Sequence, residues 1–179
     1  MVQVRVLGVA LDAARQHVVL LKPILEEEGE GRILPIWIGA QEATSILIAI
    51  QGEQAPRPLS HDLITTLFGA VGATLEQAEV TRIDEGTFYA ELTLRTPTGR
   101  QMIDARPSDA VALAVRAGAP ILVDDDVLEE AGIAAELLEP HEPHEPSDAE
   151  VAEGAALDEA KLAEFKRFLE DVDPEDFQG

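Results

Sequence analysis

The chain has 179 residues, of which 46% are hydrophobic and 27% are charged, and its formal net charge is −22. This apolar content excludes a disordered chain and suffices for one domain with a hydrophobic core plus an appendage. The chain lacks cysteine, which excludes disulfides and thiolate metal sites and favours a reducing compartment. Acidic residues are in excess both in residues 1–133 and in residues 134–179. Binding to nucleic acid would therefore need a local cluster of arginines or a bound cation.

The first fifty residues predict three strands and one helix. Residues 2–11, 17–22 and 32–38 are rich in β-branched residues, which indicates strands. Residues 40–51 carry apolar side chains at positions 43, 46, 47 and 50, which is a helical stripe, and Gly52 is placed to end that helix. The chain starts as a strand without a charged leader, and no apolar run reaches bilayer length. We therefore expect a cytoplasmic protein that makes no contact with a membrane.

A second helix is expected after a loop that contains two prolines. Residues 53–59 form this loop, because Pro56 and Pro58 both disfavour regular structure there. Ser60 is a good N-cap for a helix over about residues 61–71. The residues expected on the buried face of this helix are Leu63, Ile64, Leu67 and Phe68.

The next part of the chain predicts an antiparallel meander. Residues 74–84, 87–96 and 100–105 are strand-like, and they are joined by the tight-turn sequences Glu-Gly and Pro-Thr-Gly. A helix to Ala117, a strand over 121–123 and a brief helix from 124 to about 132 complete the pattern. This order of elements favours an α+β domain with a mainly antiparallel sheet and helices packed on it, and it does not suit a doubly wound sheet.

The last part of the chain is expected to be an appendage to this domain. We place the domain at residues 1–133 and an acidic, proline-rich linker at 134–156, where His-Glu-Pro occurs twice in succession. Residues 157–179 are predicted to be an amphipathic helix with a short tail. A helix of this length is marginal in water by itself, so it is expected to pack on the domain or on a second chain.

The segment at 104–110, Asp-Ala-Arg-Pro-Ser-Asp-Ala, has an unusual concentration of charge. Pro107 is well placed in a first helical turn, and Ser108 and Asp109 can accept hydrogen bonds from the N–H groups of that turn. Asp104 and Arg106 precede the helix, and helix capping does not explain them. A junction between a strand and a helix holds such groups at the surface, where a substrate could reach them.

Four blocks of the chain resemble, in order and spacing, the bifunctional nuclease domain, a bacterial and plant family. They are the junction at 104–110, Leu-Pro-Ile-Trp-Ile-Gly at 34–39 with Glu42 following, Arg-Pro-Leu-Ser-His-Asp-Leu at 57–63, and Thr-Phe-Tyr-Ala at 87–90. The resemblance covers roughly residues 1–133, and the acidic C-terminal extension suggests a member of the actinobacterial type. It implies a hydrolase, a nuclease that cleaves phosphodiester bonds in RNA, DNA or both.

The resemblance also implies a site built from these blocks. The implied catalytic residues are the acids Glu42, Asp62, Asp104 and Asp109, which would orient water or hold a cation, and His61, which would act as general acid and base. The implied phosphate ligands are Arg57, Arg106 and Ser108. Asp104 and Asp109 are the candidate ligands of a divalent cation, Mg²⁺ or Mn²⁺.

Ordinary structural roles can explain several of these residues. Glu42, Asp62 and Asp109 are favourable acids near helix N-termini. By that interpretation His61 is a surface residue of a first turn. Trp37, the only tryptophan, is expected in the core or in an interface rather than as a platform for stacking bases.

A binding or assembly module without catalysis remains the alternative function. Its charged cluster would hold a small anion, a nucleotide or a partner protein. Exposed strand edges and the C-terminal helix favour a homo-oligomer in either case. The nuclease interpretation requires the turns near residues 60 and 106 to meet in one cleft.

Overall fold

The fold is known from a computed structural model, which describes residues 1–27, 30–53 and 55–135. These residues form an α+β domain with one eight-stranded, mostly antiparallel sheet and four helices. The strands are β1 (Val2–Leu11), β2 (His17–Pro23), β3 (Arg32–Ile38), β4 (Thr74–Asp84), β5 (Thr87–Thr96), β6 (Gly99–Ala105), β7 (Ile121–Val123) and β8 (Ile133–Ala134). The helices are α1 (Ala40–Gln51), α2 (Ser60–Ala70), α3 (Pro107–Ala117) and α4 (Asp125–Ala131).

The sheet consists of two antiparallel meanders joined by a very short strand. Its order is β6-β5-β4-β7-β1-β2-β3-β8. The strand β7 pairs in parallel with β4 and antiparallel with β1, so it connects the two meanders. The parallel pair makes the sheet mixed rather than purely antiparallel.

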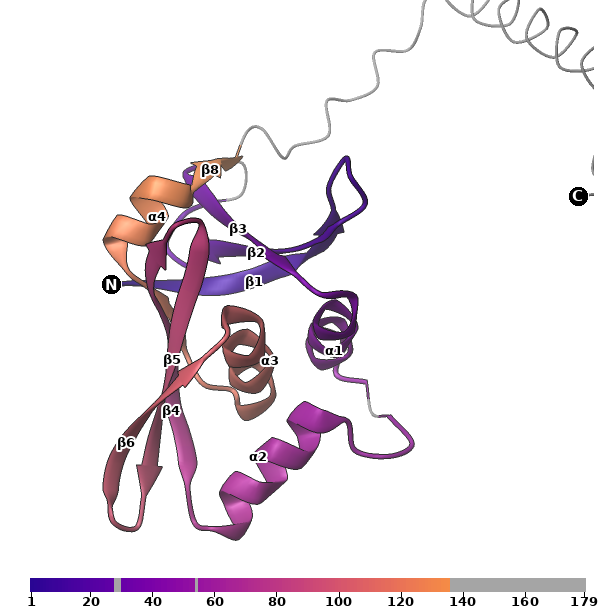
Figure 1. Cartoon of the computed structure of the whole chain (residues 1–179), viewed down its shortest axis with the longest axis vertical. Helices are drawn as coiled ribbons and strands as arrows, with labels where there is room; N and C mark the ends of the chain where they lie inside the picture. The colour runs from indigo at the N-terminus through magenta and orange to yellow at the C-terminus, as the bar shows by residue number, and fades with distance from the viewer. Residues whose placement is uncertain (28–29, 54, 136–179) are drawn as a thin grey trace, which may run out of the picture. The chain divides into compact units, whose positions relative to one another are not determined.

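Helix α3 supplies the centre of the hydrophobic core. In Figure 1 it lies in the angle between the β4–β6 meander and the β1–β3 meander, with α1 beside it. Its residues Ala110 to Ala114 are all buried, and they pack against buried side chains of both meanders, such as Leu92 and Leu34. Small alanines let the helix approach the sheet closely, and Gly118 ends the helix in the left-handed conformation with φ 64°.

Most of the predicted elements are confirmed, since the three strands of each meander, α1 and α3 occur where the sequence predicts them. One local prediction is wrong, one of the two alternatives for Trp37 is excluded, and one strand is additional. Ser60 is the first residue of α2 rather than its cap: Leu59 is the N-cap residue, and its N–H donates a hydrogen bond to Oδ2 of Asp62 at 2.8 Å, as in one half of a capping box. Trp37 is not in the core, since 54% of it is exposed at the surface of β3. The strand β8 was not foreseen.

The exposed face of α2 also differs from the prediction. Ile64 and Phe68 pack against the core, whereas Leu63 and Leu67 are about half exposed. Together with Val71 they form an apolar stripe that no described residue covers.

The loop between β2 and β3 is organised by a buried lysine. Lys22 is almost fully buried, and its ammonium group donates hydrogen bonds to the main-chain carbonyls of Glu27 and Glu30. A buried ammonium is tolerated only with such partners. Lys22 therefore closes this loop through main-chain acceptors, while Glu26 accepts a hydrogen bond from the N–H of Arg32 at 2.9 Å.

The predicted linker and C-terminal helix lie almost entirely outside the described residues. In the described part, the chain continues beyond α4 into β8, which pairs with β3, and Ala135 then donates to the carbonyl of Gly31. Among the described residues no helix is long and apolar enough to cross a membrane.

Candidate active-site cleft

Three helices begin around one cleft of about 770 Å³. Its lining includes Ala40 to Glu42 of α1, Leu59 to His61 at the start of α2, and Arg106 and Asp109 at the start of α3. A helix N-terminus carries partial positive charge and unsatisfied N–H groups, so three of them together favour anions. Each helix places one carboxylate in its first turn, namely Glu42, Asp62 and Asp109. The turns near residues 60 and 106 thus meet in one cleft.

Arg106 bridges two of these carboxylates. Its Nε and Nη2 donate to the two oxygens of Asp109 at 2.7 and 3.1 Å, and Nη2 also lies 2.9 Å from Oε1 of Glu42. The pairing is bidentate, which fixes the orientation of the guanidinium. The remaining nitrogen, Nη1, donates to no residue that the structure describes, and 67% of the side chain is exposed. Arg106 therefore keeps donors available to a ligand while it is held by the protein.

His61 lies behind Asp109 rather than at the open face of the cleft. Its Nε2 is 3.0 Å from Oδ1 of Asp109, and its Nδ1 is 2.8 Å from the hydroxyl of Ser45. His61 and Ser45 are both buried, whereas the Asp109 side chain is 28% exposed. Of this chain of three groups, Asp109 is the one that solvent and substrate reach most easily.

The partners of Ser45 determine which nitrogen of His61 holds the proton. Arg116 Nη2 donates to the Ser45 hydroxyl at 3.0 Å, so that oxygen acts as an acceptor there. Its own proton then has Nδ1 of His61 as its acceptor. The carboxylate of Asp109, which is paired with Arg106, only accepts hydrogen bonds, so Nε2 of His61 carries the proton that this contact needs, and this is consistent with Nδ1 accepting from Ser45.

Arg116 connects the three helices α1, α2 and α3 next to the hydrogen-bonded series Ser45, His61 and Asp109. Its Nε donates to Oδ1 of Asp62 at 2.5 Å, Nη1 donates to the carbonyl of Ala112, and Nη2 reaches the carbonyl and hydroxyl of Ser45. The side chain is only 8% exposed. The other oxygen of Asp62 accepts a hydrogen bond from the N–H of Leu59, so both carboxylate oxygens have partners within the protein.

These contacts shift the pKa values of the acids in the cluster. Burial acts to raise the pKa of Asp109, but hydrogen bonds from Arg106 and His61 outweigh it and hold that pKa below its ordinary value. The hydrogen bond from Arg116 lowers the pKa of Asp62, with help from the N–H of Leu59. The hydrogen bond to Asp109 is the main reason that the pKa of Arg106 is raised. Both aspartates are therefore ionised at neutral pH.

The remaining predicted site residues lie near the cluster without joining it. Arg57 is exposed in the loop before α2, two residues from the cleft residue Leu59, and has no hydrogen-bonded partner in the described part of the chain. Asp104 lies at the cleft but pairs across the sheet with Glu91, so these two carboxylates share one face of the sheet. Ser108 lines a neighbouring pocket instead. The sequence predicted that Ser108 and Asp109 would accept hydrogen bonds from the first turn of α3, but neither side chain does so. The carboxylate of Asp109 is held instead by Arg106 and His61.

Two members of the network could not be recognised as site residues from the four matched blocks. Ser45 and Arg116 lie outside those blocks. Arg116 does carry a signal, because it is the only charged residue between Val111 and Gly118 in an otherwise apolar helix. A single guanidinium in such a stretch indicates a buried partner. Ser45, which follows the stripe residue Ala43, carries no comparable signal.

The arrangement does not fit a resident divalent cation. The guanidinium of Arg106 occupies the place between the carboxylates of Glu42 and Asp109 where a cation would bind. Within the described residues no group of three or more His, Cys, Asp or Glu side chains is placed to hold a metal ion. Arg106 provides the positive charge of the cleft itself.

Comparisons with known proteins identify the family of the chain. The family description "Bifunctional nuclease domain" matches residues 23–136. The chain is 42% identical to an uncharacterized protein of Mycobacterium tuberculosis, over 99% of this chain and 98% of that protein. It is 25% identical to "Bifunctional nuclease 1" of Oryza sativa over 68% of this chain and 37% of that protein, and 29% identical to "Bifunctional nuclease 2" of Arabidopsis thaliana over 55% and 31%. The similarity to the plant proteins thus covers about a third of their length.

Proposed function

The chain belongs to the bifunctional nuclease domain family, and from this premise we propose that it hydrolyses phosphodiester bonds in RNA or DNA at the cleft around Arg106. The observation that carries this proposal is the meeting of three helix N-termini at one exposed arginine. Helix N-termini and guanidinium groups are both suited to a phosphate diester. Relatives named as nucleases in plants support the same reaction class at low identity.

In the proposed reaction the phosphate binds between Arg106 and the helix N-termini. Nη1 of Arg106 and the N–H groups of the first turns hold the non-bridging oxygens. They stabilise the negative charge that builds up on these oxygens in the transition state. Arg57, which is exposed in the loop before α2, would add a second cation to the bound strand.

Asp109 is the proposed group that handles the attacking water. Its Oδ1 accepts hydrogen bonds from both His61 and Arg106, whereas its Oδ2 accepts only from Nε of Arg106 and retains a lone pair for the water. The water oxygen forms a bond to phosphorus while its proton passes to Asp109 and on to solvent. The bond from phosphorus to the leaving oxygen breaks, and the leaving oxygen takes a proton from water in the open cleft.

The other members of the cluster position these two groups. Glu42 braces the guanidinium of Arg106, and His61 holds the carboxylate of Asp109 through Nε2. His61 lines the cleft, but it is buried and both of its ring nitrogens are taken up by Asp109 and Ser45, so we assign it a positioning role. Proton transfer by His61 at the substrate stays a prediction from the sequence.

The test is cleavage of labelled single-stranded and duplex RNA and DNA by the purified full-length chain. We expect Asp109→Asn and Arg106→Gln each to lower the cleavage rate by about 100-fold or more. The matched control is Arg95→Gln, because Arg95 is also an exposed arginine paired with a carboxylate, Glu76, and does not line the cleft. Wild-type protein that cleaves none of the four substrates would contradict the proposal, as would variants that cleave at the wild-type rate.

One observation favours the alternative of a binding module without catalysis. Every carboxylate in the first turns has a cationic partner, and a lowered pKa makes Asp109 a weak base. In this case the cleft would bind a phosphate or nucleotide and leave it intact. Retained binding of labelled strands in the absence of any cleavage would identify this alternative.

A further inference from the structure

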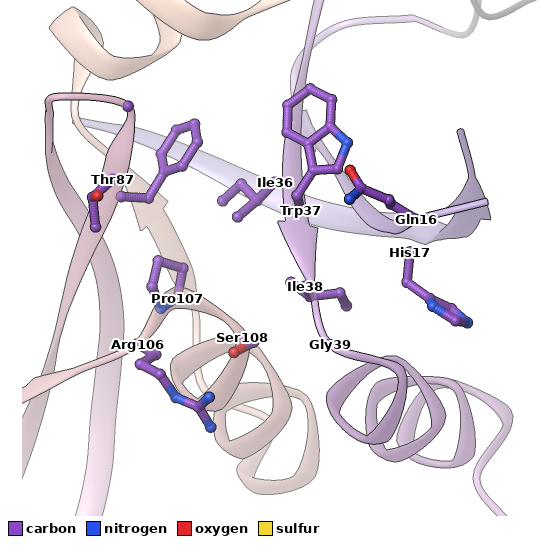
Figure 2. Close-up of a pocket in the computed structure, with 12 residues that line it drawn as sticks. Gln16, His17, Ile36, Trp37, Ile38, Gly39, Thr87, Arg106, Pro107 and Ser108 are labelled. Atoms are coloured by element: carbon purple, nitrogen blue, oxygen red, sulfur yellow. The ribbon is translucent and has the colours of Figure 1, made fainter. Parts of the chain in front are cut away.

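A second pocket, of about 570 Å³, lies on the other side of Arg106. Arg106 is the one residue that lines both hollows. Figure 2 shows this pocket between the start of α3, with Pro107 and Ser108, and the end of β3, with Trp37 and Ile38. A ligand that is longer than one hollow can therefore continue past Arg106 into the other.

The upper part of the pocket is apolar and aromatic. Trp37 and Ile36 come from β3 and Phe88 comes from β5. The Trp37 indole N–H donates to Oδ2 of Asp12 at 2.9 Å, so the ring is held in place although 54% of the residue is exposed. A fixed and exposed indole provides a flat surface on which a planar ring can stack.

The lower part of the pocket has polar groups without partners. Ser108 is only 6% exposed, yet its hydroxyl bonds to no described residue. The main-chain N–H of Ser108 belongs to the first turn of α3 and has no described acceptor either. Among the described residues no fully buried side-chain oxygen lacks a partner, so the unpaired hydroxyl of Ser108 opens into the pocket. A hydroxyl beside a free N–H group at a helix N-terminus is a donor set that a phosphate uses.

Three polar side chains line the edge of the pocket. Gln16, His17 and Thr87 present amide, imidazole and hydroxyl groups at its edge. Such groups can pair with the polar edge of a nucleobase, whose face would lie on the indole. The pocket thus combines an aromatic wall, polar edges and an anion end.

We propose that this pocket binds one unpaired nucleotide, with the base on Trp37 and the phosphate on Ser108 and the N-terminus of α3. The inference rests on the proposed function, which it deepens, because it makes single-stranded nucleic acid the substrate class. A base in this pocket is out of its helical stack, so a duplex has to open before it binds. The phosphodiester next to the bound nucleotide then lies at Arg106, in the cleft.

The single tryptophan allows a direct test on the full-length chain. We expect adenosine 5′-monophosphate and uridine 5′-monophosphate to change the tryptophan fluorescence in a saturable manner. Adenosine should bind more weakly than its monophosphate, and inorganic phosphate should compete with the monophosphate. No change in fluorescence at millimolar nucleotide would overturn the proposal.

Substitutions separate the two ends of the pocket. Ser108→Ala should weaken binding of the monophosphate at least fivefold and leave adenosine binding within twofold. Thr66→Ala is the matched control, because Thr66 is an exposed hydroxyl on α2 that bonds only to the carbonyl of Asp62. An equal loss of adenosine and monophosphate binding in Ser108→Ala would rule out Ser108 as the phosphate ligand.

Calorimetry on Trp37→Ala should show at least tenfold weaker binding of both ligands, and unchanged affinity would contradict the stacking role.

This test and the test of the proposed function fail independently. A chain that binds nucleotides at Trp37 but cleaves nothing refutes the nuclease and leaves the pocket. A chain that cleaves duplex and single strands equally, without a fluorescence response to nucleotides, refutes the pocket and leaves the nuclease. Asp109→Asn should lose cleavage and retain the fluorescence response.

Discussion

Arg116 joins the three helices around the cleft through one guanidinium group. It donates to Asp62 on α2, to Ser45 on α1 and to Ala112 on its own helix. Its removal would leave the buried acceptors of Ser45 without a donor and Asp62 without its cation. Losing one member of a buried pair costs more than the pair itself contributes.

We predict that Arg116→Met lowers the free energy of unfolding by about 2–4 kcal/mol. Methionine retains most of the apolar stem, so the loss reports on the hydrogen bonds. Arg95→Met, which removes an exposed pair with Glu76, should cost less than about 1 kcal/mol. Urea unfolding followed by circular dichroism measures both, and equal stability of the two variants would contradict the prediction.

The positions of the site residues could be predicted from the sequence more readily than their roles. The matched blocks contain Glu42, His61, Arg106 and Asp109, and the structure brings these four together. Their partners could not be foreseen, because the bonds of His61 to Ser45 and Asp109 join segments 16 and 48 residues apart. His61 is therefore a buried residue with two fixed partners, which its position in a first turn did not indicate.

The elements themselves were predictable where local chemistry determines them. Tight turns such as Glu85-Gly86, where both residues have positive φ, mark the ends of β4 and β5. The order of strands was not predictable, since the parallel pair of β4 and β7 joins Ala78 to Ile121. The exposure of Leu63 and Leu67 on α2 could not be predicted either, because it also depends on contacts between distant segments. Periodicity shows that a helix has an apolar face but not which part of it the fold covers.

The strand β6 leaves one edge of the sheet open. It pairs only with β5, and Met102 on it is 67% exposed. A second β6 running antiparallel across a two-fold axis at Met102 would place Arg100 opposite Asp104 of the second copy. Opposite charges at facing positions favour such a pair. We therefore propose that the chain forms a homodimer through β6.

We predict that the wild-type chain is a dimer at micromolar concentration and that Met102→Lys weakens the dimer at least tenfold. A lysine on an edge strand opposes pairing because it would face a second lysine across the axis. Leu25→Lys is the control, since Leu25 is highly exposed in the loop after β2. Light scattering after size-exclusion chromatography gives the mass. A monomeric wild type at these concentrations would contradict the prediction.

The molecule as a whole carries a net charge of −22 and yet depends on ionised carboxylates. The hydrogen bond from the indole of Trp37 lowers the pKa of Asp12, and the hydrogen bond from Arg116 lowers the pKa of Asp62. Burial acts to raise the pKa of Asp109, but Arg106 and His61 outweigh it and lower that pKa as well. At these groups the unfolded chain binds protons more readily than the folded chain does. Stability is therefore fully present above the unfolded pKa of about 4 and is lost as the pH falls through the folded values.

We predict that the thermal midpoint of unfolding falls by several degrees as the pH is lowered from 5 to 3. Asp62→Asn should be less stable than wild type at pH 7 and should show a weaker dependence on pH, because it lacks one of the carboxylates involved. Asp84→Asn, at the exposed last residue of β4, should retain the wild-type slope. Scanning calorimetry between pH 3 and pH 7 makes the measurement, and parallel curves for Asp62→Asn and wild type would contradict it.

The placement of β7 has a consequence for how the protein is made. Its three residues, Ile121–Val123, are the seam between the two meanders, yet a ribosome adds them after both meanders and all of α3. Until they emerge, β1 and β4 each expose an edge that only this late segment can cover. A nascent chain paused just before residue 121 is thus the form most exposed to aggregation and to chaperones.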